Sequence, residues 1–342
     1  MFLNHFNKIL KYPGIAIVVF ILIAFSLPGI CNETTEPKPV CTEDQAKAYM
    51  AEVLPLVENA AERKFKTQPL LKLVTPDEVE QILAKELIPQ FRNLQPKSKL
   101  SDLQKDAEAV AGIYGKCMLG KYGTSAKTLF VIPENIEPCL KITKVDPKHQ
   151  TAIIKLTIAH ELVHALQDQY IDLNKKLTQT KSAEQISAFS CTIEGHATFI
   201  QDKVAESLGL QESAKEFARA IGAGAESLDP AMALLNRTQA KIVSDQYLSG
   251  RDFIAWNYNK GGSDLVWDIL ASPPVKTSMI LHPDTYSPIY SPTLDYGSLL
   301  KGLQYQFGPR KWTVQNIEVG EIQLRALYAD MDPKLLEKVL VN

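Results

Sequence analysis

The chain has 342 residues, 45% of them hydrophobic, and its 37 basic residues nearly balance 39 acidic ones. This length allows one large or two modest domains, and the composition is that of an ordinary globular protein. A formal charge of -2 excludes the strongly basic surface of a nucleic-acid-binding protein, so we expect no nucleic-acid partner.

The first 30 residues are expected to lie outside the fold. Lys8 and Lys11 precede an apolar run from Ile15 to Leu27, which is the pattern of a secretory signal peptide. The run is shorter than the roughly 20 apolar residues of a membrane-spanning helix, although an uncleaved N-terminal membrane anchor is the alternative. We therefore expect export to the periplasm and cell envelope or to the extracellular space, with any membrane contact made by this segment.

The cysteines are consistent with export. Cys31 directly follows the leader, as in a lipoprotein, but Ile30 is bulkier than the residue that lipobox cleavage prefers. An exported protein tolerates disulfide bonds. The other four cysteines could form disulfide bonds or remain small buried thiols, and the sequence does not choose between these two interpretations. They are Cys41, Cys117, Cys139 and Cys191.

A polar, proline-bearing tether is predicted over residues 31–41, followed by a single domain over residues 42–342. Thr42 is suited to cap a first helix, in which apolar residues recur at helical spacing. Thr75 is suited to cap a second helix, with Pro76 at its first position and its end near Phe91.

The next segments predict a small sheet and two long helices. Gly120 to Thr124 is typical of a turn, and Thr128 to Ile132 is β-branched and aromatic, which favours a strand. Helices are predicted from Thr151 to Leu173 and from Ser182 to Leu208. Five prolines in residues 272–292 indicate an ordered loop or a series of turns. The fold class predicted is therefore α+β and mainly helical.

The first of the two long helices carries an HExxH motif at residues 160–164. Residues four apart lie on one face of a helix, so His160 and His164 can bind the same Zn²⁺. Glu161, one step around the helix, can take a proton from a metal-bound water. Isoleucines bracket both histidines, which indicates a mostly buried face where unpaired polar groups cost free energy unless something binds them. The alternative is a pair of core histidines satisfied by other side chains.

A zinc hydrolase needs a third protein ligand and an open fourth position. Glu194 on the second long helix is our candidate, because it lies at the edge of the apolar stripe beside small residues; an exposed helix carboxylate is the alternative. Gly195 suggests a close approach by another backbone, for which the helix with the two histidines is the natural neighbour. His196 is an alternative ligand, but residues two apart point to nearly opposite sides of a helix.

Residues 160–173, HELVHALQDQYIDL, together with the later EGHAT at residues 194–198, resemble the HExxH-plus-Glu (gluzincin-type) zincin metallopeptidases. The chain is most similar to a group of largely uncharacterised secreted bacterial proteins that pair HELxHALQDQ with a later EGxAT. The resemblance implies a zincin-like metallopeptidase fold with a small β-sheet and an active-site helix. It also implies zinc bound by His160, His164 and Glu194, with Glu161 as general base.

The proline-rich loop offers groups that could stabilise the oxyanion of a tetrahedral intermediate. We predict this role for His282 and, as a second candidate, for Tyr286; packing of the loop histidine against other tyrosines is the alternative. Asp168, one turn beyond His164, is suited either to orient a ligand imidazole or to lie on the helix surface.

The function predicted is zinc-dependent hydrolysis of peptide bonds in the cell envelope, with a peptide or protein as substrate. A di-iron carboxylate site is excluded because the chain has no second ExxH. The rival hypothesis is a catalytically inactive, envelope-anchored binding or scaffold protein that keeps the zincin fold. An intact Glu161 argues against this rival, because an inactive site does not need the base.

Overall fold

The computed structural model describes residues 39–116, 118–180, 182–223, 230–286 and 320–327. The predicted leader, most of the tether, Cys31 and Cys117 lie outside these residues. Cys41, Cys139 and Cys191 are buried. Within the described ranges, none of the helices combines the length and apolar character that a membrane crossing requires.

Capping side chains begin the first two long helices where the sequence predicts them. α3 (Glu43–Ala61) follows Thr42, whose Oγ1 accepts the N–H of Gln45 while the Gln45 side chain accepts the N–H of Thr42. α4 (Pro76–Leu94) follows Thr75 in the same arrangement, with a proline in its first turn. Such capping boxes satisfy backbone N–H groups that have no partner inside the helix. Both predicted helices are confirmed.

Three short strands form the sheet in the order β1-β3-β2. β1 (Leu70–Leu73) pairs parallel with the central strand β3 (Thr128–Val131), and β2 (Gly120–Gly123) pairs antiparallel with the other side of β3. The predicted strand at residues 128–132 is therefore confirmed as β3. β2 is an edge strand, and it packs against the helix that carries the HExxH motif.

The turn predicted at residues 120–124 is wrong, because β2 occupies residues 120–123. The two glycines that suggested a turn serve close packing instead. A Cβ atom at Gly120 would lie 2.6 Å from Cγ2 of Thr157, and one at Gly123 would lie 2.7 Å from the Phe130 ring. Glycine at these two positions therefore lets the edge strand approach its neighbours.

The two long helices are confirmed as α7 (Gln150–Ile171) and α9 (Ala183–Ser207), which pack against each other. A third long helix, α11 (Pro230–Ala271), was not predicted, and it packs along α9. A Cβ atom at Gly195 would lie 2.1 Å from the carbonyl carbon of Gly250 in α11. Gly195 does mark a close backbone approach, but the neighbour is α11 and not the histidine helix that we expected.

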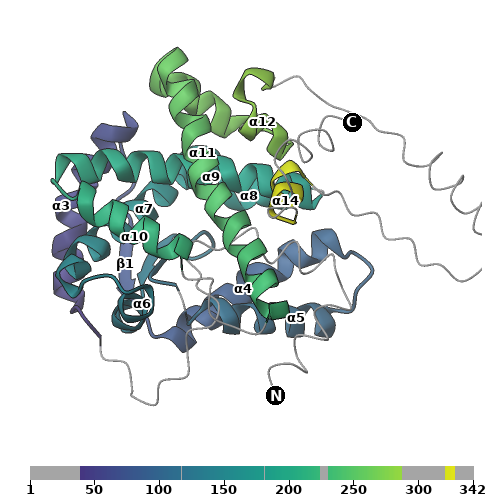
Figure 1. The fold of residues 1–342 in the computed structure, drawn as a ribbon, viewed down its shortest axis with the longest axis horizontal. Coiled ribbons are helices and arrows are strands. Elements are labelled where there is room, and N and C mark those ends of the chain that lie inside the picture. Colours follow the sequence, from purple (N-terminus) through teal and green to yellow (C-terminus); the bar gives the residue numbers. More distant parts are fainter. Residues whose placement is uncertain (1–38, 117, 181, 224–229, 287–319, 328–342) are drawn as a thin grey trace, which may run out of the picture.

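α4 packs against α5 (Leu100–Tyr114), and the two helices form the lower part of the molecule in Figure 1. They form most of a second hydrophobic cluster, in which Leu83, Leu87 and Phe91 are almost fully buried and to which α9 contributes Ile186. A larger cluster spans α3, the sheet, α7, α9 and α11. The remaining helices are α6 (Ile136–Thr143), α8 (Leu173–Gln179), α10 (Gln211–Ala223), α12 (Thr277–Leu281) and α14 (Glu321–Leu327).

The proline-rich segment is described up to residue 286 and contains α12 followed by a single 3-10 turn at Pro283–Thr285. The rest of the predicted loop lies outside the described residues. As predicted, the fold is mainly helical with a small β-sheet. Its assignment as zincin-like, and the extent of a single domain over residues 42–342, stay predictions.

Candidate metal centre

The structure brings His160, His164 and Glu194 together, where α7 and α9 pack against each other. Nε2 of His160 lies 3.2 Å from Nε2 of His164. Oε2 of Glu194 lies 3.0 Å from Nε2 of His160 and 3.3 Å from Nε2 of His164. The two imidazoles are buried, and the Glu194 side chain is 15% exposed. One helical turn separates the histidines, so helix geometry alone sets their spacing.

Two glutamine amides determine which nitrogen of each imidazole faces the cluster. Nδ1 of His160 lies 2.9 Å from Oε1 of Gln201, and Nδ1 of His164 lies 2.9 Å from Oε1 of Gln167. An amide oxygen only accepts hydrogen bonds, so each Nδ1 carries a proton and donates it. In the neutral imidazole this leaves the Nε2 lone pair directed at the cluster.

The three ligand atoms fit a metal ion. Two Nε2 lone pairs and a carboxylate oxygen repel one another unless a cation or a proton lies among them. Zinc bonds of about 2.1 Å in a tetrahedron separate neighbouring ligand atoms by about 3.4 Å. The separations found, 3.0, 3.2 and 3.3 Å, are close to that value. These residues could therefore bind a metal ion, and imidazole with carboxylate is a ligand set that suits zinc.

The charges at the cluster are strongly coupled. Burial alone would lower the pKa of His164, but the Glu194 carboxylate, followed by that of Glu161, raises it to about 9. Burial alone would raise the pKa of Glu194, but His164 and His160 hold it far below its usual range. Without a metal ion the cluster therefore holds a proton near neutral pH, in the place where a cation would bind.

Glu161 is held beside the cluster by the edge strand. Its Oε2 accepts the backbone N–H of Tyr122 at 2.6 Å, and its side chain is 2% exposed. The Glu161 side chain also lines the pocket described below. β2 therefore fixes the carboxylate and leaves one oxygen able to accept a proton.

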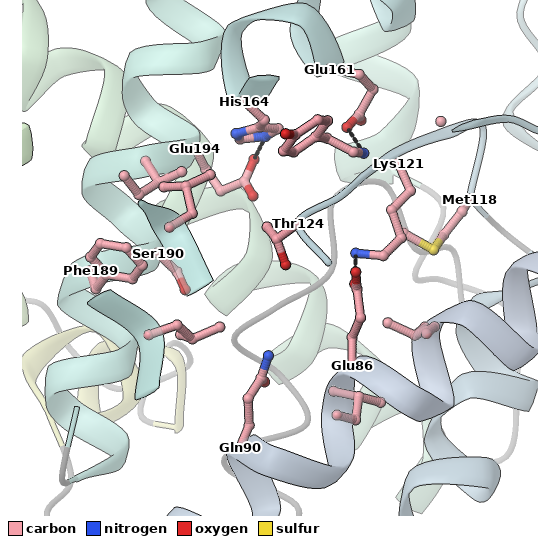
Figure 2. A pocket seen from close by; sticks show the side chains of 17 residues that line it. Glu86, Gln90, Met118, Lys121, Thr124, Glu161, His164, Phe189, Ser190 and Glu194 are labelled. Atoms are coloured by element: carbon pink, nitrogen blue, oxygen red, sulfur yellow. Dashed lines mark hydrogen bonds and ion pairs between the residues drawn. The ribbon is translucent and has the colours of Figure 1, made fainter. Parts of the chain in front are cut away.

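The cluster opens into a pocket with an internal volume of about 110 Å³. Figure 2 shows His164, Glu194 and Glu161 at one end of this pocket. Gln90 and Glu86 from α4 lie at the opposite end. The pocket therefore lies between the helices that carry the cluster and α4.

His196, the alternative third ligand, lies outside the cluster. Its Nδ1 lies 3.0 Å from Nε2 of Gln167, and its ring packs edge-on against Trp267. Burial, and then the positive charge of His164, lowers the pKa of His196 to about 3, so this imidazole is neutral. A neutral imidazole accepts the N–H of Gln167 and so helps to orient the amide that holds His164.

Asp168 does not orient a ligand imidazole. Its Oδ2 accepts hydrogen bonds from the Tyr122 hydroxyl at 2.7 Å and from the Lys127 ammonium at 2.6 Å. Its Oδ1 accepts the backbone N–H of Leu173 at 3.0 Å. Asp168 therefore ties the β2–β3 hairpin to the end of α7. The role that we predicted for Asp168, to orient a ligand imidazole, is filled by Gln167, which accepts the Nδ1–H of His164.

The structure does not bring His282 and Tyr286 to the pocket. His282 ends α12, and its Nε2 lies 3.0 Å from Oε1 of Glu321. The Tyr286 hydroxyl donates to the carbonyl of Ser272 at 2.6 Å. Neither side chain lines the pocket. The catalytic roles of these two residues stay predictions without support from the geometry.

Several residues at the cluster were not predicted. Gln167 lies within the HALQDQ stretch that carries the family resemblance, so its position three residues after His164 was an available signal. Gln201 lies seven residues after Glu194, two helical turns along α9, and could have been found from that spacing. Tyr247 of α11 packs with its ring centroid 5.8 Å from that of His160. No local pattern marks Tyr247, because α11 reaches the cluster only through tertiary packing.

Comparisons with known proteins find little. No family model matches the chain, and no curated protein matches it. Among solved structures, it is similar to the crystal structure of a "putative hydrolase with a novel fold" from Chloroflexus aurantiacus, with 13% sequence identity and a TM-score of 0.46. The match covers 75% of this chain and 94% of that chain. Similarity at this level does not bear on function, and the zincin resemblance stays a prediction.

Proposed function

We propose that the protein is a zinc-dependent hydrolase of peptide bonds. One observation carries this proposal: His160, His164 and Glu194 converge with fixed lone pairs beside Glu161, at the end of a pocket. A structural histidine pair would not need a second carboxylate, that of Glu161, held beside it by the Tyr122 N–H. The arrangement matches the needs of a metallopeptidase, which are three ligands, an open position and a base.

Three side chains would bind the metal ion, and two glutamines would orient the imidazoles among them. His160, His164 and Glu194 would hold the zinc ion, which supplies a Lewis acid that polarises a carbonyl group and acidifies water. Gln201 and Gln167 keep both imidazoles in the tautomer that binds metal.

Glu161 would act as the general base and then as the general acid. The N–H of Tyr122 holds Oε2, so Oε1 is the oxygen that accepts a proton from the attacking water and delivers it to the leaving amine. Because the strand fixes the carboxylate before substrate binds, little reorganisation is needed during the reaction.

We also propose that the protein acts after export, in the cell envelope or outside the cell. The support is the basic and apolar pattern of residues 1–30. Fractionation of cells that express the full chain tests this proposal, since recovery of the protein with cytosolic markers would contradict it.

The test of the activity combines metal analysis with a single substitution. We expect one zinc per chain in the wild type and in Glu161→Gln, and cleavage of a broad peptide library by the wild type alone. The matched control is Glu108→Gln, the same change at an exposed position of α5, which should keep both zinc and cleavage. Absence of zinc would refute the metal centre. A zinc-loaded wild type that cleaves no peptide would favour the scaffold hypothesis instead.

A further inference from the structure

The end of the pocket opposite the cluster is polar. Glu86 and Gln90 lie one turn apart on α4, and Figure 2 shows Gln90 pointing into the pocket and Glu86 meeting Lys121 of β2. Oε2 of Glu86 lies 2.8 Å from Nζ of Lys121, and the two side chains are 11% and 13% exposed. A buried ion pair thus closes this end.

Two acceptor oxygens here have no protein partner. Oε1 of Glu86 and Oε1 of Gln90 are buried, and neither has a hydrogen-bond partner in the described part of the chain. A buried acceptor without a donor costs free energy, which a ligand with N–H groups would recover. The site therefore favours a ligand that donates hydrogen bonds.

The walls between the two ends are mainly apolar, although Thr124 and Ser190 also line them. Leu83, Leu87 and Met118 line one side, and Phe189 and Ile193 line the other. A mainly apolar passage begins at the three candidate metal ligands and ends near the acceptor oxygens. It suits a substrate side chain with an aliphatic stem and a polar end. The internal volume, about 110 Å³, is large enough to admit a side chain of this kind.

The charges select the polar end of that side chain. Glu86 and Lys121 neutralise each other, so a lysine or arginine would bring an uncompensated cation next to the Lys121 ammonium. A carboxylate would face Glu86 and has no hydrogen to donate. A carboxamide is neutral, and its two N–H groups can pair with the oxygens of Glu86 and Gln90 once these buried atoms turn toward the pocket, while its own oxygen can accept from Lys121.

We propose that this pocket is a specificity subsite for a substrate side chain that ends in a carboxamide. Glutamine fits best, because asparagine has a stem one methylene shorter. This inference rests on the proposed peptidase function, since it places the side chain of a residue next to the bond that is cut.

The test measures binding and cleavage separately. Peptides that differ only in Gln, Met, Lys or Glu at one position are titrated onto zinc-loaded Glu161→Gln protein and followed by fluorescence anisotropy. The same peptides, with a quenched fluorophore, are offered to the wild type. The series is repeated with the varied residue on each side of the central bond. In one series we expect the Gln peptide to bind at least about tenfold more tightly than the other three.

Substitutions on α4 connect the preference to the pocket. Gln90→Leu should reduce the preference for Gln over Met to about threefold or less. The matched control, Gln81→Leu at an exposed position of α4, should keep it. If Gln90→Leu does not fold, Gln90→Glu is used instead. Its carboxylate adds negative charge beside the Glu86–Lys121 ion pair, so the preferred peptide should change from Gln to Lys.

The outcomes for the subsite and for the activity differ. Equal binding of all four peptides, or a preference of the unsubstituted pocket for Lys or Glu, would overturn the subsite. Cleavage without discrimination would do the same and leave the peptidase function standing. A Gln preference in binding, with no cleavage of any peptide by the wild type, would support the subsite and refute the peptidase function.

Discussion

Each imidazole of the candidate metal centre is held at Nδ1 by a glutamine amide and not by a carboxylate. Gln201 and Gln167 accept the Nδ1–H groups without adding negative charge to the cluster. An amide also donates, and the Gln167 N–H groups bond to the Ile193 carbonyl and to His196. One side chain therefore links a ligand on α7 to the backbone of α9 next to Glu194.

We predict that Gln167→Leu weakens zinc binding by about 10- to 100-fold, because His164 loses the acceptor that fixes its tautomer and ring orientation. The measurement is competition with a chromogenic chelator. The exposed Gln179→Leu in α8 is the control and should bind zinc like the wild type. Equal affinities in both variants would show that the amide does not position the ligand.

Zinc binding should depend on pH. In the metal-free protein the Glu194 carboxylate overcomes burial and raises the pKa of His164 to about 9, so zinc displaces a proton at neutral pH. Below pH 9 the affinity should fall about tenfold per pH unit, with about one proton released per zinc at pH 7. Calorimetry in two buffers of different ionisation enthalpy measures this release. Identical heats in the two buffers would contradict it.

The same shift affects the stability of the metal-free protein. A pKa raised from 6.5 to about 9 on folding contributes stability that is fully present below pH 6.5 and lost between pH 6.5 and 9. The lowered pKa of Glu194 contributes stability that is present above pH 4.5 and lost as the pH falls.

The crossing of α9 and α11 is the tightest contact between helices that carry or cover the cluster. We predict that Gly195→Ala lowers the free energy of unfolding by about 3 kcal/mol or more, because the new Cβ would lie 2.1 Å from the Gly250 backbone. Zinc content should fall as well, since Glu194 adjoins the displaced residue. Denaturant unfolding and metal analysis measure the two effects. Ser207→Ala at the exposed end of α9 should change stability by less than about 0.5 kcal/mol; a similar small change for Gly195→Ala would contradict the prediction.

Helices with a capping residue or regularly spaced apolar residues could be predicted from the sequence. α3, α4, α7 and α9 have local starting signals or helical spacing, and the histidines follow from the period of the helix. α11 packs against α9, α12 and α14 and bends at Gly262, so its buried residues follow no single stripe. β2 was taken for a turn because glycines at both of its ends are typical of turns, whereas here they allow close packing against Thr157 and Phe130, which no local pattern reveals.

The candidate site also contains residues that the sequence predicts and residues that it does not. His160, His164, Glu161 and Glu194 could be found because their spacing within helices carries the chemistry. The residues that fix or extend the cluster come from tertiary packing: the Tyr122 N–H, the Glu86–Lys121 ion pair and the Tyr247 ring each approach from another element. His282 and Tyr286 were chosen from loop composition, which does not determine where a loop packs.

At the scale of the whole molecule, a bound metal ion would join α7 to α9 in the centre of the larger core. We predict that chelation lowers the melting temperature by several degrees, because zinc at 1,000 times its Kd stabilises the folded state by about 4 kcal/mol. Thermal unfolding with and without a chelator measures the shift. The Glu161→Gln protein should show the same lowering of the melting temperature by the chelator, because Glu161 is not a proposed ligand. The Glu194→Ala protein should show none. A chelator-sensitive Glu194→Ala protein would place the metal elsewhere.

The α4–α5 pair packs in a second hydrophobic cluster, to which α9 contributes Ile186, and the candidate ligands lie in the larger core. One wall of the pocket therefore belongs to a helix that carries none of the candidate ligands. Substitutions at the pocket face of α4 would change which substrates are accepted while zinc affinity stays the same. This separation makes α4 the natural place for divergence among relatives, and the first helix to randomise when a new cleavage preference is sought in the laboratory.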